Sequence, residues 1–209
     1  MLMVSIAVAP ALLMQAVPAV PGGCTAAASE NVGAPGCYLS AELTIEASPP
    51  TLYWHIVRMR SEAPAKAEVG RYRWATAVPA HGRWWLYVLS ADAREPKLPD
   101  HHVVGPFRTK RDGPVVARFM ESLFPPGMRT RVHAHSGPEA FYVIDGEQCT
   151  ETPDDRRRIK AGESYIVPGG LHLQAAPKGR RNVVLVLAPV GEPWISLSDA
   201  WAGTGYCES

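Results

Sequence analysis

One short run of the chain, residues 127–146, constrains its fold more than any other feature. The run reads GMRTRVHAHSGPEAFYVIDG and combines alternating histidines with a Ser-Gly-Pro turn and an Asp-Gly turn. Alternate side chains of an extended strand point to the same face, so His133 and His135 project together. The Ser-Gly-Pro turn then brings the carboxylate of Glu139 back toward both imidazoles. Two imidazoles and one carboxylate from neighbouring strands suit a divalent transition metal.

The spacing of this run resembles the first signature of the cupin superfamily, Gly-x5-His-x-His-x3-Glu-x6-Gly. Every defined position is matched, by Gly127, His133, His135, Glu139 and Gly146. A His-x-His pair alone is often a polar stripe that faces solvent, and short motifs produce false matches. The offset of the glutamate and the two framing glycines make this match specific.

The run GESYIVPGGLH, which begins at Gly162, resembles the second cupin signature, Gly-x5-Pro-x-Gly-x2-His-x3-Asn. Pro168 fits, but a single residue separates Gly170 from His172, and an alanine occupies the place of the final asparagine. A shift of one residue in a strand reverses its face. The shorter turn therefore either tightens and keeps His172 as a fourth ligand, or turns His172 outward and leaves Gln174, whose amide is a poor metal ligand. We expect His172 to be kept, since a histidine is otherwise hard to explain on an apolar strand.

The resemblance implies an all-β fold, an antiparallel β-barrel or double-sheet jelly roll over residues 115–195 with additional N-terminal strands. It also implies one divalent transition metal (Mn, Fe, Ni, Cu or Zn) held by His133, His135, Glu139 and His172. A metal-dependent, dioxygenase-like oxidoreductase that acts on a small organic molecule fits this ligand set. A non-catalytic cupin module that binds a metal or a small ligand also fits it, because a fold does not fix a function.

Three further residues are candidates for contacting a substrate. Arg129 and Arg131 alternate with His133, so their guanidinium groups either face the same interior and bind a carboxylate, or meet solvent at the barrel rim. Phe141 shares a face with Glu139 and is either a substrate contact or part of the core.

The N-terminal residues read as a targeting segment rather than as part of the fold. Residues 1–20 are almost wholly apolar, but Pro10, Gln15 and Pro18 interrupt them, so stable insertion into a membrane is not expected. We interpret residues 1–28 as a signal peptide without a basic start. The protein is then secreted or periplasmic, or a lipoprotein attached through Cys24, whereas a cytoplasmic protein with an apolar leader is the alternative. The cysteines are expected to be structural, with their pairing left open.

The remaining boundaries follow from composition and turn residues. A small-residue linker occupies 29–36, an N-terminal β extension 37–114, the barrel 115–195 and a C-terminal tail 196–209. Within the extension, strands are expected at 37–45, 52–59, 71–78 and 84–89, and a surface loop at 91–112. These strands either extend one sheet of a single barrel, which we favour, or form a degenerate second barrel. The histidines of this region are read as surface or turn residues; they are His55, His81, His101 and His102.

Charge excludes one class of partner. The formal net charge is +1, from 21 basic and 20 acidic side chains, which gives no electrostatic reason to expect nucleic-acid binding. A small molecule is the expected partner, and formation of a homodimer is left open.

Overall fold

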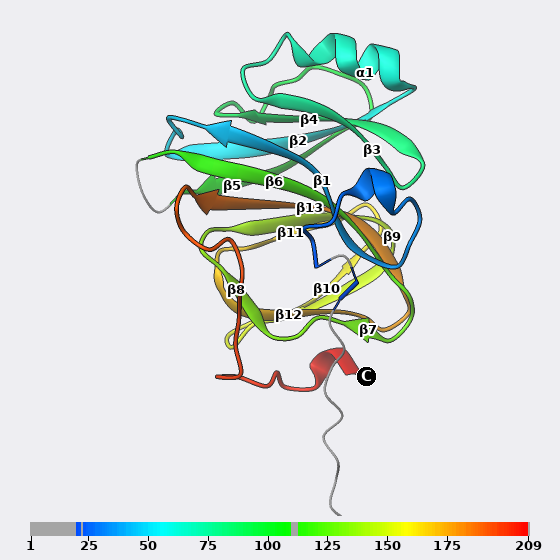
Figure 1. Cartoon of the computed structure of the whole chain (residues 1–209), viewed down its shortest axis with the longest axis vertical. Helices are drawn as coiled ribbons and strands as arrows, with labels where there is room; N and C mark the ends of the chain where they lie inside the picture. Colours follow the sequence, from blue (N-terminus) through cyan, green and yellow to red (C-terminus); the bar gives the residue numbers. More distant parts are fainter. Residues whose placement is uncertain (1–19, 22, 110–112, 209) are drawn as a thin grey trace, which may run out of the picture.

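The computed structural model describes residues 20–21, 23–109 and 113–208 of the chain, so most of the predicted signal peptide lies outside the described residues. The fold is built from antiparallel strands in two sheets, which confirms the predicted all-β class (Figure 1). Within the described residues, no helix combines the length and the apolar character that crossing a membrane requires.

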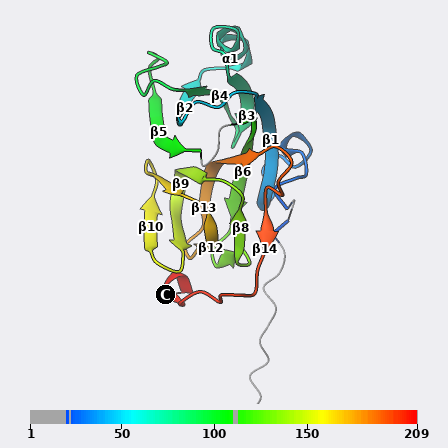
Figure 2. The same cartoon turned by 90° about the vertical axis from the view of Figure 1, so that its left-hand side faces the viewer.

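The larger sheet curls into the barrel, and its strands run in the order β1-β6-β13-β9-β12-β8-β14, with β10 and β11 paired to β9 and β7 paired to β12. Figure 2 shows this curled sheet below the smaller one, with the C-terminus at the far end. Its strands are β1 (Gly36–Ile45), β6 (Val115–Phe124), β7 (Met128–Arg129), β8 (His133–His135), β9 (Glu139–Glu151), β10 (Arg156–Lys160), β11 (Ser164–Val167), β12 (Gly170–Ala176), β13 (Arg180–Pro189) and β14 (Ser196–Leu197).

The smaller sheet has the order β3-β4-β2-β5 and carries the helix α1 on its outer side (Figure 1). Of the N-terminal extension, β1 therefore joins the barrel sheet, while the other strands form a sheet of their own. Its elements are β2 (Thr51–Met59), α1 (Glu62–Val69), β3 (Ala75–Ala80), β4 (Arg83–Ser90) and β5 (His101–Arg108); the short 3-10 helices η1 (Ala28–Glu30) and η2 (Tyr206–Glu208) lie near the two ends of the chain.

Two local expectations in this region were wrong. The segment 91–112, expected to be a surface loop, contains β5, which completes the smaller sheet by pairing with β2. The helix α1 was not expected, because it buries the side chain of Ala65 but shows no apolar stripe. Its sequence, EAPAKAEV, is rich in good helix formers, so propensity rather than periodicity explains it.

The strand β13 is covered on both faces, by the smaller sheet on one side and by the barrel interior on the other. Val183, Leu185 and Leu187 pack in the core between the two sheets, whereas the alternate residues Val184 and Val186 pack inside the barrel. A strand covered on both faces reads as a continuous apolar run, as residues 183–188 do. By the same alternation, the polar residues at positions 180 and 182 belong to the barrel face.

Disulfides fasten both ends of the described chain to the barrel. Cys24 is bonded to Cys37 at the start of β1, and Cys149 on β9 is bonded to Cys207 in η2. The bond at Cys24 holds the segment after residue 20 against β1, where the backbone of Leu39 also donates to the carbonyl of Ala26. The cysteines therefore have the structural role that we expected, and the structure defines their pairing.

Candidate metal centre

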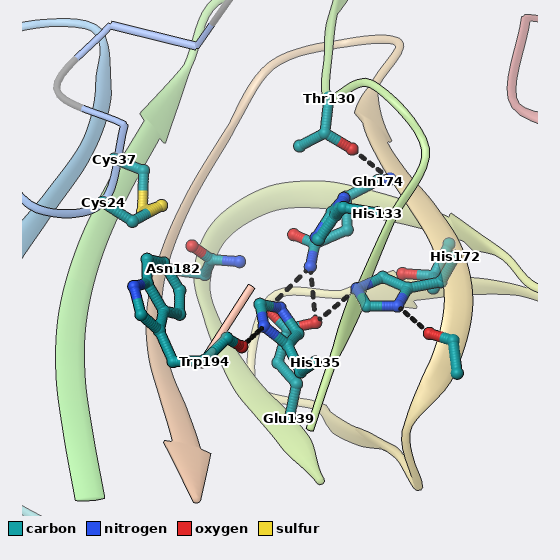
Figure 3. Close-up of polar contacts among 12 residues, drawn as sticks. Cys24, Cys37, Thr130, His133, His135, Glu139, His172, Gln174, Asn182 and Trp194 are labelled. Atoms are coloured by element: carbon teal, nitrogen blue, oxygen red, sulfur yellow. Dashed lines mark hydrogen bonds and ion pairs between the residues drawn. A yellow bond between two sulfur atoms is a disulfide. The ribbon is translucent and has the colours of Figure 1, made fainter. Parts of the chain in front are cut away.

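Four buried side chains meet inside the barrel, and they are the four that the sequence predicts as ligands. His133 and His135 come from β8, Glu139 begins β9 and His172 lies on β12 (Figure 3). One ligand atom from each residue lies within 4.8 Å of the others. None of the four is more than 7% exposed. The structure therefore brings together an imidazole-carboxylate set that could hold one metal ion.

Strand pairing explains why His172 belongs to this group despite the shortened second signature. In the register of β8 with β12, His172 lies directly opposite His133 and Gly170 lies opposite His135. The tight turn before His172 is made by Gly169 and Gly170, whose φ angles are +117° and +87°. Such angles strain residues with side chains but not glycine, so the two glycines absorb the missing residue. The expected tightening of this turn is what the structure shows.

A hydrogen bond from Nδ1 to a backbone carbonyl fixes the orientation of each imidazole. The Nδ1 atoms of His133, His135 and His172 lie 2.9, 2.7 and 3.0 Å from the backbone carbonyl oxygens of Arg131, Trp194 and Gly170. A carbonyl oxygen accepts but does not donate, so each Nδ1 carries the proton and donates it. A neutral ring then presents an unprotonated Nε2 toward the centre, which is the tautomer that metal ligation requires.

The carboxylate of Glu139 is held as firmly as the rings. The side-chain amide of Gln174 donates to both carboxylate oxygens at 2.8 Å, and Nε2 of His172 lies 2.9 Å from Oε2 of Glu139. The backbone of Gln174 is itself fixed, because its N–H donates to the hydroxyl of Thr130 at 3.0 Å. These contacts orient the carboxylate toward the three imidazoles (Figure 3).

Burial and mutual contact set the protonation of the group. Burial and, to a smaller extent, the neighbouring His172 lower the pKa of His133 to about 3. Burial also lowers the pKa of His135. Burial alone would raise the pKa of Glu139, but the hydrogen bond with His172 and the surrounding imidazoles outweigh it and lower that pKa. The same contact raises the pKa of His172 against the effect of burial.

The donor set fits a transition metal on two observations. The Nε2 atom of His135 is buried without a hydrogen-bond partner and lies 3.8 Å from the nearest oxygen of Glu139, which is costly unless another group takes that place. Three imidazoles with one carboxylate are ligands that Mn, Fe, Ni, Cu and Zn share. This ligand set does not distinguish among these metals.

A cavity of about 280 Å³ opens beside the centre. His133, His135 and Glu139 contribute to its wall, and so does Trp194, whose indole ring stacks on His135 with 5.5 Å between the ring centroids. The cysteine pair Cys24–Cys37 also borders it, so the fastened N-terminal segment forms part of the wall. The remaining wall is mostly apolar, with Met120, Phe124, Val184, Ile195 and Leu197 among its residues.

The three residues proposed to contact substrate lie in different places. Arg131 borders the cavity and pairs with Asp199 at 3.2 Å. Arg129 does not border it and forms an ion pair with Glu208 of η2. Phe141 is fully buried and packs in the apolar core of the barrel.

The structure adds residues that the sequence interpretation did not assign to the site. Gln174 lies two positions after His172 on one strand, so the rule that places such residues on the same face was available. Arg180 and Trp194 carried no comparable signal, because they reach the cavity from β13 and from the segment after it.

Comparison with known proteins agrees with this geometry. The family model of the cupin domain matches residues 120–188, which confirms the resemblance predicted from the two signatures. No curated protein matches the chain.

Solved structures similar to the chain include a cupin superfamily protein of Desulfitobacterium hafniense, with 14% identity over 41% of this chain and 74% of that one and a TM-score of 0.33. A cupin-like protein of Thermotoga maritima has 23% identity over 44% and 68%, with a TM-score of 0.37. A DMSP lyase of Ruegeria pomeroyi has 21% identity over 45% and 46%, with a TM-score of 0.36.

Proposed function

Since the chain contains a cupin domain over residues 120–188, we propose that it is a metal-dependent enzyme that acts on a small organic molecule, with dioxygenase-like oxidation as the reaction class. The observation that carries this proposal is the set of three buried imidazoles and one carboxylate, whose ligand atoms lie within 4.8 Å of one another beside a largely apolar cavity. A purely structural metal site needs no cavity next to it, whereas a catalytic site keeps a position accessible to substrate.

The residues of the chain have distinct roles in this proposal. His133, His135, Glu139 and His172 would hold the metal, which would supply a Lewis-acidic and redox-active centre when bound. The carbonyl groups that accept from each Nδ1 fix the orientation of the rings. The apolar wall of the cavity excludes bulk water from the reacting molecule.

We also propose that the protein is exported, either secreted or periplasmic. Disulfides persist in oxidising compartments, and the pairs Cys24–Cys37 and Cys149–Cys207 agree with such a location. The pair at Cys24 bears on processing, because cleavage after Ala28 would remove Cys24. It is also incompatible with a lipid on that residue, since both would use the same sulfur. We therefore place the cleavage site before Cys24, and non-reducing mass spectrometry of the mature protein tests this.

Metal analysis of protein purified without a chelating column tests the enzymatic proposal. We expect about one transition metal per chain, and oxygen uptake when a panel of small aromatic and aliphatic acids is added. The variant His135→Ala should lose both, whereas His55→Asn, which changes a buried histidine of the smaller sheet, should keep both. A chain that binds no metal contradicts the proposal. Bound metal without any oxygen uptake favours the non-catalytic binding module.

A further inference from the structure

A buried cation lies in the wall of the cavity, and the metal centre does not account for it. Arg180, the first residue of β13, is 3% exposed and borders the cavity together with Gln174 and Glu139. Its guanidinium lies 3.9 Å from the ring centroid of Phe124. Burying a charge is costly unless the charge is paired.

The polar partners of Arg180 are neutral. Nη1 donates to the hydroxyl of Ser122 at 2.9 Å and to the side-chain carbonyl of Asn182 at 2.7 Å, and Nη2 is 3.4 Å from the side-chain oxygen of Gln174. Among the described residues, no ion pair involves Arg180. The Nε atom is buried without a hydrogen-bond partner. The guanidinium thus retains unused donor capacity at Nε and a long contact at Nη2.

Glu139, the carboxylate closest to Arg180 in this hydrogen-bond network, cannot serve as the negative partner of Arg180 once a metal is bound. Glu139 reaches Arg180 through Gln174, whose amide donates to Glu139 and whose oxygen faces the guanidinium. A bound metal ion would neutralise the carboxylate of Glu139 and so weaken its attraction for the guanidinium of Arg180. Burial lowers the pKa of Arg180 to about 9 and the carboxylate of Glu139 opposes this fall, so the side chain is a cation at neutral pH.

We propose that Arg180 anchors the carboxylate of the substrate, so that the cavity selects a small acid with an apolar body. This inference rests on the proposed function and specifies its substrate class. Nε and Nη2 lie on one edge of the planar guanidinium, the arrangement that binds a carboxylate through two parallel hydrogen bonds; Nε is covered in this structure, so the carboxylate meets Nη2 first and pairs with both atoms after the Arg180 side chain shifts. The apolar part of the acid then lies against Met120, Val184 and Ile195, next to the metal ligands.

This assignment differs from the arginine candidates that the sequence offered, Arg129 and Arg131. Arg131 is exposed, and its guanidinium is paired with Asp199. An exposed ion pair contributes little to the binding of a further carboxylate, whereas a buried guanidinium without a carboxylate partner gains much from it.

A matched pair of probes tests the proposal, namely phenylacetate and its neutral amide, phenylacetamide, titrated calorimetrically into zinc-loaded protein. We expect phenylacetate to bind at least about ten-fold more tightly to the wild-type chain. The preference should fall to near one in Arg180→Gln and persist in Arg181→Gln, which removes the same charge from the exposed neighbouring position. A preference that survives in Arg180→Gln, as it would if the carboxylate bound the metal directly, overturns the proposal.

Two additional measurements keep the test decisive. If Arg180→Gln does not fold, the wild-type protein labelled with 15N is used instead. The side-chain Nε–H resonance of Arg180 should then shift on addition of phenylacetate and not of phenylacetamide; an unchanged resonance contradicts the proposal. Metal content is measured on the same samples, so that a chain without zinc contradicts the proposed function, whereas zinc-loaded protein without the preference contradicts the role of Arg180 alone.

Discussion

Histidines meet at two places in this molecule, and the contrast between them shows what distinguishes a group of side chains that could hold a metal from a buried polar contact. In the barrel, three rings converge on Glu139. In the smaller sheet, His55 on β2 is fully buried and lies beside His101 on β5, with 2.9 Å between Nδ1 of His55 and Nε2 of His101. His55 was expected to be a surface or turn residue, which the structure contradicts.

The difference between the two places lies in the partner of each ring nitrogen. In the barrel, backbone carbonyls accept from every Nδ1, which leaves each Nε2 for the centre. In the smaller sheet, Nδ1 of His55 and Nε2 of His101 bond to each other, which leaves Nε2 of His55 without a partner, but no third histidine, cysteine or carboxylate among the described residues joins them as a ligand set. Close contact between rings is common to both places, and the partners of Nδ1 and the number of converging ligand atoms separate them.

The largest expected effect comes from removing one ligand. His135→Ala deletes an imidazole from the centre, and we expect metal affinity to fall by more than about 100-fold, which exceeds the usual cost of losing an outer partner. His55→Asn should leave the affinity unchanged. Titration with a competing chelator measures both. Equal losses in the two variants would remove the distinction drawn between the two places.

A smaller effect is expected from the residue that holds the carboxylate. Gln174→Leu removes the donor to both oxygens of Glu139 without removing a ligand, and we expect metal affinity to fall by about 10–100-fold. Gln148→Leu is the matched control, because Gln148 is equally buried but bonds to Thr150 and Asn182. Unchanged affinity in Gln174→Leu would show that Glu139 needs no such support.

The smallest expected effect concerns pH and the smaller sheet. Burial, followed by the nearby His101, lowers the pKa of His55 from 6.5 to about 4. The unfolded chain therefore takes up a proton at a higher pH than the folded chain does, and stability falls as the pH drops from about 6.5 toward 4. Between pH 7.5 and 5.5 this group costs about 1 kcal/mol of stability. Denaturant unfolding should show that His55→Asn loses about that much of the wild-type pH dependence, and an identical dependence in both chains would contradict this.

The parts of the site that the sequence predicted are those fixed by local geometry. The His-x-His alternation places His133 and His135 on one face, and a single short turn separates them from Glu139, so their spacing favours their convergence. His172 was predictable through the consecutive glycines before it, which tolerate the tight turn that the shortened spacing demands.

The parts that the sequence did not predict depend on pairing between distant segments. Arg180 reaches the cavity because β13 pairs with both β6 and β9, and no local pattern encodes that pairing. In the smaller sheet, β5 follows a segment rich in charges and prolines, and its partner β2 lies some distance away in the sequence. The burial of His55 follows from the same pairing.

X-ray absorption spectroscopy at the metal edge of zinc-loaded protein tests the central claim most directly. We predict a first shell of nitrogen and oxygen atoms at about 2.0–2.2 Å, with the outer-shell scattering of three imidazole rings. The His55→Asn variant should give the same spectrum, and His135→Ala should lose one imidazole or the metal altogether. A wild-type spectrum without imidazole scattering, or a chain that takes up no zinc, would contradict the claim that these four side chains form a metal centre.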